Sequence, residues 1–172
     1  MHIGNLPSSL RGKMRRARRL MPDAAARAWL REQRVLHVAT IDEDGWPYII
    51  PLVFVYPGEE FLYFHTGAGD GHFLRNIRRH PVVCVEASEI GPLHPGRPYA
   101  CNSTLVYTSV IAWGRVRIVE DEETKIWFFD QLVEKYGDPT LFEPGYPFLD
   151  RIVLYEMTIE LLTGKRSEGL RH

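Results

Sequence analysis

The chain has 172 residues, of which 45% are hydrophobic and 25% are charged, and its formal net charge is −1. These values are typical of one soluble globular domain with a sizeable core, and the nearly neutral charge gives no general reason to bind nucleic acid. No apolar stretch has the length of a membrane span. Cys84 and Cys101 are too few for a disulfide framework and lack CxxC spacing. We therefore expect a cytoplasmic protein whose partners include neither nucleic acid nor a membrane.

Residues 1–21 form a basic segment. Its positive side chains are concentrated at Arg11, Lys13, Arg15, Arg16, Arg18 and Arg19. Such a segment is either a solvated arm, an extension over a partner subunit, or a binding site for an anionic partner. We interpret it as an N-terminal arm, followed by a single domain at 22–166 and a C-terminal tail at 167–172.

Hydrophobic periodicity and turn residues predict six strands and three helices. In chain order, these are a helix at 22–30, strands at 35–41, 46–56 and 61–65, a short helix after Gly71, strands at 82–87 and 99–119, a helix at 121–136 and a strand at 153–161. Gly- and Pro-rich segments at 89–98 and 138–149 are expected to be loops. Pro47 and Pro51 remove backbone donors from the second strand, which therefore has to be bulged or lie at a sheet edge. We expect a mainly β, α+β fold: a six-stranded antiparallel barrel whose open parts the longer helices cover.

A glycine-rich loop follows the third strand. Gly67, Gly69 and Gly71 lie between the strand and the short helix, and Arg75, Arg78 and Arg79 follow within that helix. Glycines let backbone N–H groups converge, and a helix N-terminus attracts anions. This pattern indicates a loop that cradles a phosphate, although a purely structural turn is the alternative. Asp70 adds a negative charge there unless it caps the helix.

Four segments, taken in order, resemble the FMN-binding split-barrel family that includes the pyridoxamine 5′-phosphate oxidases, and within it the branch of 5-nitroimidazole-resistance proteins. The segments are LHVATIDEDGWPYIIPL at 36–52, LYFHT at 62–66 with Gly71, YTSVIAWG at 107–114 and IELLTGK at 159–165. The resemblance implies a split β-barrel homodimer that holds FMN in two clefts between its subunits.

The resemblance also implies a set of site residues. The cofactor-binding residues would be Ile50, Pro51, Leu52, Val53, His65, Thr66, Gly71, His72, Arg75, Tyr107 and Ser109. Residues 50–53 would lie along the flavin ring, and His65 and Thr66 would border the ring and the phosphate arm. His65 would be the catalytic residue on the substrate side of the flavin. Tyr107 and Ser109 would lie on the strand nearest the partner subunit's cofactor.

One position departs from the family pattern. Many relatives have Lys or Arg directly after the loop glycine, whereas this chain has His72. Because a free histidine is mostly neutral at pH 7, it is a weaker phosphate anchor, and we expect Arg75, one helical turn later, to take over. The departure leaves the deazaflavin F420 as an alternative cofactor, and haem is the alternative if the protein is a carrier or sensor.

The sequence thus predicts an FMN-dependent oxidoreductase acting on a small molecule, with reduction of nitroaromatic compounds as one reaction. No His pair has the spacing of a metal site, and no GxSxG nucleophile motif occurs. The alternatives are a non-catalytic carrier or sensor that binds flavin, F420 or haem, and a dimeric scaffold without cofactor.

Overall fold

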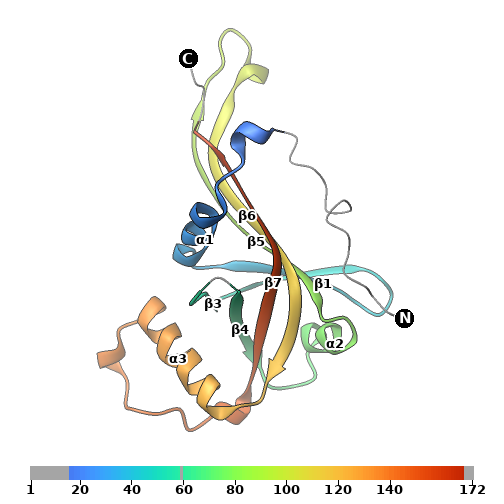
Figure 1. Ribbon diagram of the computed structural model, residues 1–172, viewed down its shortest axis with the longest axis vertical. Coiled ribbons are helices and arrows are strands. Elements are labelled where there is room, and N and C mark those ends of the chain that lie inside the picture. Colours follow the sequence, from blue (N-terminus) through green and yellow to red (C-terminus); the bar gives the residue numbers. More distant parts are fainter. Residues whose placement is uncertain (1–15, 59, 169–172) are drawn as a thin grey trace.

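The computed structural model describes residues 16–58 and 60–168 (Figure 1). The strands are β1 (Leu36–Ile41), β2 (Pro47–Leu52), β3 (Phe54–Val55), β4 (Phe61–Gly67), β5 (Val82–His94), β6 (Thr104–Val119) and β7 (Ile152–Ser167). The α-helices are α1 (Asp23–Glu32), α2 (His72–Arg79) and α3 (Glu122–Tyr136). Short 3₁₀ helices are η2 (Ala17–Arg19), η3 (Ala100–Asn102), η4 (Pro139–Leu141) and η5 (Leu149–Arg151).

The described strands form one antiparallel sheet in the order β2-β1-β5-β6-β7-β4-β3. The prediction of six strands was wrong, because the expected strand at 46–56 divides at Val53. Its first part, β2, pairs with β1 at one end of the sheet, and its second part, β3, pairs with β4 at the other end. Since only Val53 joins the two parts, the sheet has to curl until its ends meet. The result is a split barrel, and β2 lies at a sheet edge as Pro47 and Pro51 predict.

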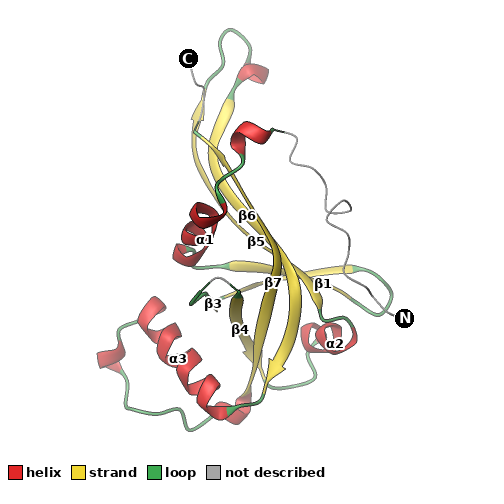
Figure 2. Cartoon of the chain, in the orientation of Figure 1, coloured by secondary structure: helices red, strands yellow, loops and turns green. Residues whose placement is uncertain are grey.

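Two hydrophobic clusters occupy opposite sides of this curled sheet. The larger contains Leu62 and Phe64 of β4, together with apolar residues of α1 and α2. The smaller contains Tyr63 and Phe128 and lies under α3. Because successive side chains on a strand point to opposite faces, β4 separates the α2 side of the sheet from the α3 side. Figure 2 shows α2 and α3 on opposite sides of the central strands.

The strands β5 and β7 are longer than hydrophobic periodicity predicts. β6, in contrast, begins only at Thr104, so the expected strand at 99–119 was wrong for its first five residues, where Ala100–Asn102 form η3. β5 continues to His94 through a bulge between Ile90 and Leu93, so the expected loop at 89–98 was wrong for its first half. β7 continues to Ser167, one residue into the expected C-terminal tail. Both extensions are paired with β6, and the extension of β5 is mostly exposed, so it lacks the alternating pattern of a half-buried strand. In Figure 1 the β5–β6 hairpin projects as an arm beyond the rest of the sheet.

The end of the N-terminal arm packs on β7. The backbone N–H of Met21 donates to the carbonyl of Gly164 at 2.9 Å, and Leu20 forms an isolated bridge with Lys165. A Cβ atom on Gly164 would lie 2.5 Å from the Cβ of Ala26, so the glycine allows α1 to approach the sheet closely. The part of the arm at residues 1–15 lies outside the described residues, as does 169–172 of the tail. Of the helices described, none is both long and apolar enough to cross a membrane.

Candidate functional site

The β1–β2 hairpin and the start of α2 are held together by a buried polar contact. The Asn76 side chain donates to the Thr40 hydroxyl at 3.0 Å, and that hydroxyl donates to the Tyr48 carbonyl at 3.3 Å. Thr40 and Asn76 are almost completely buried, so these hydrogen bonds are costly to lose. The contact fixes the helix against the edge strand β2.

His72 is the first residue of α2 and faces that hairpin. Its ring centroid lies 4.5 Å from that of Tyr48, and its Nε2 lies 4.0 Å from an Asp42 carboxylate oxygen. Asp42 also accepts the backbone N–H of Trp46 at 2.8 Å, which shapes the hairpin turn. The imidazole is therefore oriented by an aromatic ring and an acid, at a helix N-terminus.

The first turn of α2 presents unfilled backbone donors. Gly71 occupies the N-cap, and no side chain caps the helix. Asp70 does not cap it either; its carboxylate lies 3.3 Å from the Arg75 guanidinium, which also donates to the Asp70 carbonyl. The N–H groups of the first turn thus remain able to bind an anion, as the glycine-rich loop predicts. Arg75, however, is engaged with Asp70.

Thr66 lies on the same side of β4 as α2. Its hydroxyl is 3.0 Å from the hydroxyl of Tyr155, whose ring packs edge-on against Phe73 at 5.3 Å between centroids. Burial raises the pKa of Tyr155, against the opposing effects of the Thr66 hydrogen bond and of Arg78. The phenol is therefore neutral at physiological pH and positions Thr66 beside the start of α2.

His65 lies on the opposite side of β4, under α3. Its ring centroid is 5.4 Å from those of both Phe128 and Phe129. Its Nδ1 is buried and has no hydrogen-bond partner among the described residues. Burial lowers the pKa of this imidazole, so it is neutral at pH 7. The structure does not bring His65 together with Thr66 or His72, and its catalytic role stays a prediction.

The four predicted residues around the end of β2 divide between the core and the surface. Ile50 and Leu52 pack against the larger hydrophobic cluster, while Pro51 and Val53 are exposed. Within the described residues, β2 pairs only with β1, so one edge of its backbone has no strand partner. A planar ligand lying along this edge would find free backbone hydrogen-bonding groups.

Tyr107 and Ser109 lie far from Thr66 along the sheet, but closer to the end of β2, because Pro51, His37, Glu86 and Ile111 are paired in a row across β2, β1, β5 and β6. Ser109 pairs with Lys165 of β7, whereas Thr66 pairs with Val153 of the same strand. The 12 residues between Val153 and Lys165 correspond to about 40 Å along a strand. The resemblance places Tyr107 and Ser109 nearest the partner subunit's cofactor, and this role stays a prediction.

Sequence reasoning missed three contributors to the site: Asp42, Tyr48 and Tyr155. Asp42 and Tyr48 belong to the turn and strand that predict the hairpin, but nothing in their spacing shows that α2 contacts them. Tyr155 lies in an alternating strand and has no local signal at all. Among residues 16–58 and 60–168, no cluster of three or more His, Cys, Asp or Glu side chains could hold a metal ion.

The sequence model of the pyridoxamine 5′-phosphate oxidase family matches residues 22–166. Comparison with curated protein sequences gives no match.

Solved structures share the fold at low sequence identity. A flavocytochrome from Azotobacter vinelandii has a TM-score of 0.82 and 20% identity, over 98% of this chain and 79% of that one. An FAD- and haem-binding protein from Mycobacterium smegmatis has a TM-score of 0.75 and 19% identity, over 87% and 73% of the two chains. A protein described as a 5-nitroimidazole antibiotic resistance protein, from Bacteroides thetaiotaomicron, has a TM-score of 0.72 and 22% identity, over 86% of each chain.

Proposed function

The chain belongs to the pyridoxamine 5′-phosphate oxidase family, and from this we propose that it is a flavin-dependent oxidoreductase that binds FMN beside α2. The observation that supports this proposal is the uncapped first turn of α2, which lies against β2, a strand with no partner among the described residues on one of its two edges. One feature suits a phosphate and the other a planar ring. Together they match the two chemically different ends of a flavin nucleotide.

The residues on the α2 side of the sheet would bind the phosphate. Backbone N–H groups after Gly71 would donate to it, with the Thr66 hydroxyl and the His72 imidazole beside them. Arg75 would contribute only if its guanidinium bound the phosphate as well as, or instead of, Asp70. We therefore propose Thr66, Gly71 and His72 as the principal anchors.

The edge of β2 would orient the ring. Ile50 and Leu52 form an apolar base on the core side, and the exposed backbone around Pro51 and Val53 supplies polar groups. When bound, the flavin supplies the redox chemistry, and the protein supplies orientation and hydrogen bonds.

For the reaction, we propose reduction of small nitroaromatic compounds. The support is the shared fold with a protein described as a 5-nitroimidazole antibiotic resistance protein. The test is to photoreduce the flavin-loaded protein without oxygen and then add a 5-nitroimidazole. Reoxidation of the flavin together with loss of the nitro absorbance is expected, at a rate above that of free FMN. A rate equal to that of free FMN would contradict the proposal.

We also propose a homodimer in which the β5–β6 arm contacts the partner subunit. Large apolar side chains are exposed on this arm at Ile90, Leu93 and Leu105, and on the β1–β2 hairpin at Trp46 and Ile49. Exposed apolar groups of this size on two projecting elements are typical of protein interfaces. A dimer would also bring Tyr107 and Ser109 of one subunit near the other subunit's cofactor site.

A second candidate is a carrier or sensor that binds haem, and the setting of His65 favours it. A neutral imidazole with an unpartnered nitrogen is a suitable haem ligand. Aromatic rings of Phe128, Phe129 and Tyr146 lie around or next to it. Of the proteins that share the fold, one is described as binding both FAD and haem, and another is described as a flavocytochrome. His65 would then bind a cofactor of its own, apart from the flavin.

Absorbance titration separates the candidates. We expect FMN to bind with about one per chain, and Thr66→Ala and His72→Ala each to weaken it about tenfold, the effect of losing one charge-assisted hydrogen bond. His80→Ala, at the other end of the same helix, is the matched control. His65→Ala is expected to leave FMN affinity unchanged and to abolish any haem absorbance band. No spectral change with FMN, F420 or haem would leave the scaffold without cofactor as the remaining interpretation.

A further inference from the structure

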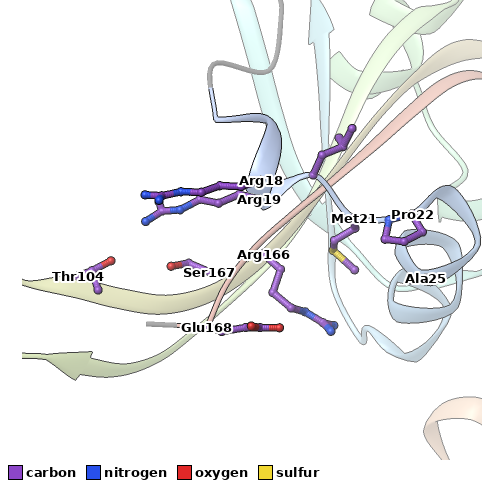
Figure 3. A pocket seen from close by; sticks show the side chains of 10 residues that line it. Arg18, Arg19, Met21, Pro22, Ala25, Thr104, Arg166, Ser167 and Glu168 are labelled. Carbon is purple, nitrogen blue, oxygen red and sulfur yellow. The ribbon is translucent and has the colours of Figure 1, made fainter. Parts of the chain in front are cut away.

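A pocket of about 380 Å³ lies where the end of the N-terminal arm crosses β7, away from α2. Figure 3 shows the side chains that surround it. Its lining residues are Arg18, Arg19, Leu20, Met21, Pro22, Ala25, Thr104, Arg166, Ser167 and Glu168. The residues proposed to bind flavin beside α2 are not among them, although Arg19 donates to Tyr107, which a dimer would bring near the partner subunit's cofactor.

The pocket has a positive lining. Three guanidinium groups face one carboxylate, that of Glu168. In Figure 3, Arg18 and Arg19 point the same way, toward the end of the pocket that contains Ser167 and Thr104. Arg166 and Glu168 lie toward the other end. Two like charges that point the same way repel each other unless an anion lies between or beside them.

A buried hydroxyl at the same end of the pocket lacks a partner. Ser167 is only 3% exposed, and its Oγ forms no hydrogen bond with any described residue. A buried polar atom without a partner costs free energy, so such atoms often mark the site of a ligand. The hydroxyl can donate to an anion bound by the two arginines.

The surrounding contacts hold these groups in place before any ligand binds. Arg19 donates to the hydroxyl of Tyr107 at 3.2 Å, and Arg166 donates to the hydroxyl of Thr108 at 3.2 Å. The backbone hydrogen bond from Met21 to Gly164 anchors the arm to β7. Part of the entropy cost of ordering the arginines is therefore already met by the fold.

We propose that this pocket binds a phosphate-bearing small molecule through Arg18, Arg19 and Ser167. A guanidinium group can donate two parallel hydrogen bonds to two oxygens of one phosphate, and a serine hydroxyl adds a further donor. The pocket volume of about 380 Å³ is more than one phosphate needs. We take the ligand to carry a diphosphate or a further group that extends toward Arg166. A diphosphate could belong to free pyrophosphate or to a dinucleotide such as FAD.

The test is calorimetric titration of the full-length protein with inorganic pyrophosphate at low salt. Pyrophosphate is expected to bind more tightly than inorganic phosphate. The Arg18→Gln/Arg19→Gln double variant should weaken it at least tenfold, and Ser167→Ala by about fivefold. Arg151→Gln removes a positive charge next to the opposite end of β7 and is the matched control. Absence of pyrophosphate binding, or equal weakening by Arg151→Gln, would overturn the proposal.

Two further titrations identify the source of the diphosphate and separate this site from the flavin site. If the ligand is a dinucleotide, FAD binds more tightly than FMN in the native protein, and the double variant removes that difference. If it is free pyrophosphate, FAD and FMN bind alike. In either case Thr66→Ala is expected to leave pyrophosphate affinity unchanged. A protein that binds pyrophosphate but no flavin would contradict the proposed function and support this pocket.

Discussion

The buried and half-buried polar side chains of this protein differ in how many interaction partners they have. His65 is surrounded by aromatic rings and leaves one nitrogen without a partner. Lys135, in contrast, is half-buried and finds two partners: its Nζ donates to the Phe54 carbonyl at 3.2 Å and lies 3.8 Å from the centroid of the Phe54 ring. Burial lowers the pKa of Lys135 to about 8, although Glu32 opposes the shift. Its charge is therefore destabilising in the folded state.

Because the pKa of Lys135 is lower in the folded protein than in the unfolded chain, the free energy of unfolding should depend on pH, and we expect the Lys135→Met variant to lack this dependence. The unfolded lysine has a pKa near 10.4, so between about pH 8 and 10 the unfolded chain binds more protons than the folded one. The free energy of unfolding should therefore rise with pH in this range, by about 1 kcal/mol once solvent screening at a half-exposed site is allowed for. Urea denaturation at pH 7.5 and 9.5 measures the rise.

The measurement ends below pH 10 because tyrosine ionisation changes the stability at higher pH. Burial, then a hydrogen bond to Glu156, raises the pKa of Tyr63 to about 12, so ionisation of tyrosine in the unfolded chain lowers stability above pH 10. Lys135→Met should show a flat profile between pH 7.5 and 9.5. A variant that keeps the rise would assign it to other groups.

At the scale of elements, one carboxylate connects three neighbouring strands. Glu156 of β7 is 6% exposed and accepts hydrogen bonds from Arg117 of β6, at 2.5 and 2.7 Å, and from Tyr63 of β4, at 2.8 Å. Burial alone would raise the pKa of Glu156, but the bonds from Arg117 and Tyr63 outweigh it and lower the pKa. The acid is thus charged and paired on the α3 side of the sheet.

Arg117→Gln is expected to lower the free energy of unfolding by about 1–3 kcal/mol, because it leaves a buried charge with less compensation. The value is below that of a fully buried pair since the Arg117 side chain is 63% exposed. The folded pKa of Glu156 is depressed, so its contribution is present above the unfolded pKa and is lost as pH falls through the folded one. Chemical denaturation from pH 7 to pH 3 measures both effects.

The double variant Arg117→Gln/Glu156→Gln is the control for this network. Removing both charges should restore part of the lost stability and flatten the acid dependence, since no buried charge remains. If the single and double variants were equally unstable, the cost would come from lost packing of the long side chain and not from an unpaired carboxylate.

At the scale of the whole molecule, the homodimer that we propose depends on contacts made by the projecting β5–β6 hairpin. Its exposed Ile90 and Leu93 lie on the part of β5 that extends beyond the sheet. We expect Ile90→Glu/Leu93→Glu to convert a dimer to a monomer and to weaken FMN binding, because a charge in an apolar interface is strongly unfavourable. Light scattering after size-exclusion chromatography measures the mass.

The matched control at this scale is Leu141→Glu/Phe142→Glu. These residues are also exposed apolar side chains but lie in the loop between α3 and β7. They are expected to leave both the mass and the FMN affinity unchanged. A monomeric native protein, or dissociation by the control variant alone, would contradict the proposed use of the arm.

The sequence by itself determined the features that depend on neighbouring residues. The helices at α1, α2 and α3, the turn at Asp42 and the edge position of β2 follow from caps, glycines, prolines and periodicity, and the structure confirms them. The ordered motifs were sufficient for the family, which the match over residues 22–166 confirms. The sequence left open whether Asp70 caps α2, and the structure shows that it does not.

Only the tertiary structure decided which of these features meet. Division of the chain at Val53 and the placement of His65 under α3 depend on residues distant in the sequence or on the direction in which a strand turns. The contact of β7 with the N-terminal arm, which brings the buried Ser167 hydroxyl to the same pocket as Arg18 and Arg19, also depends on residues distant in the sequence. Local propensity specifies a strand, but the curl of the sheet determines what lies on each of its faces.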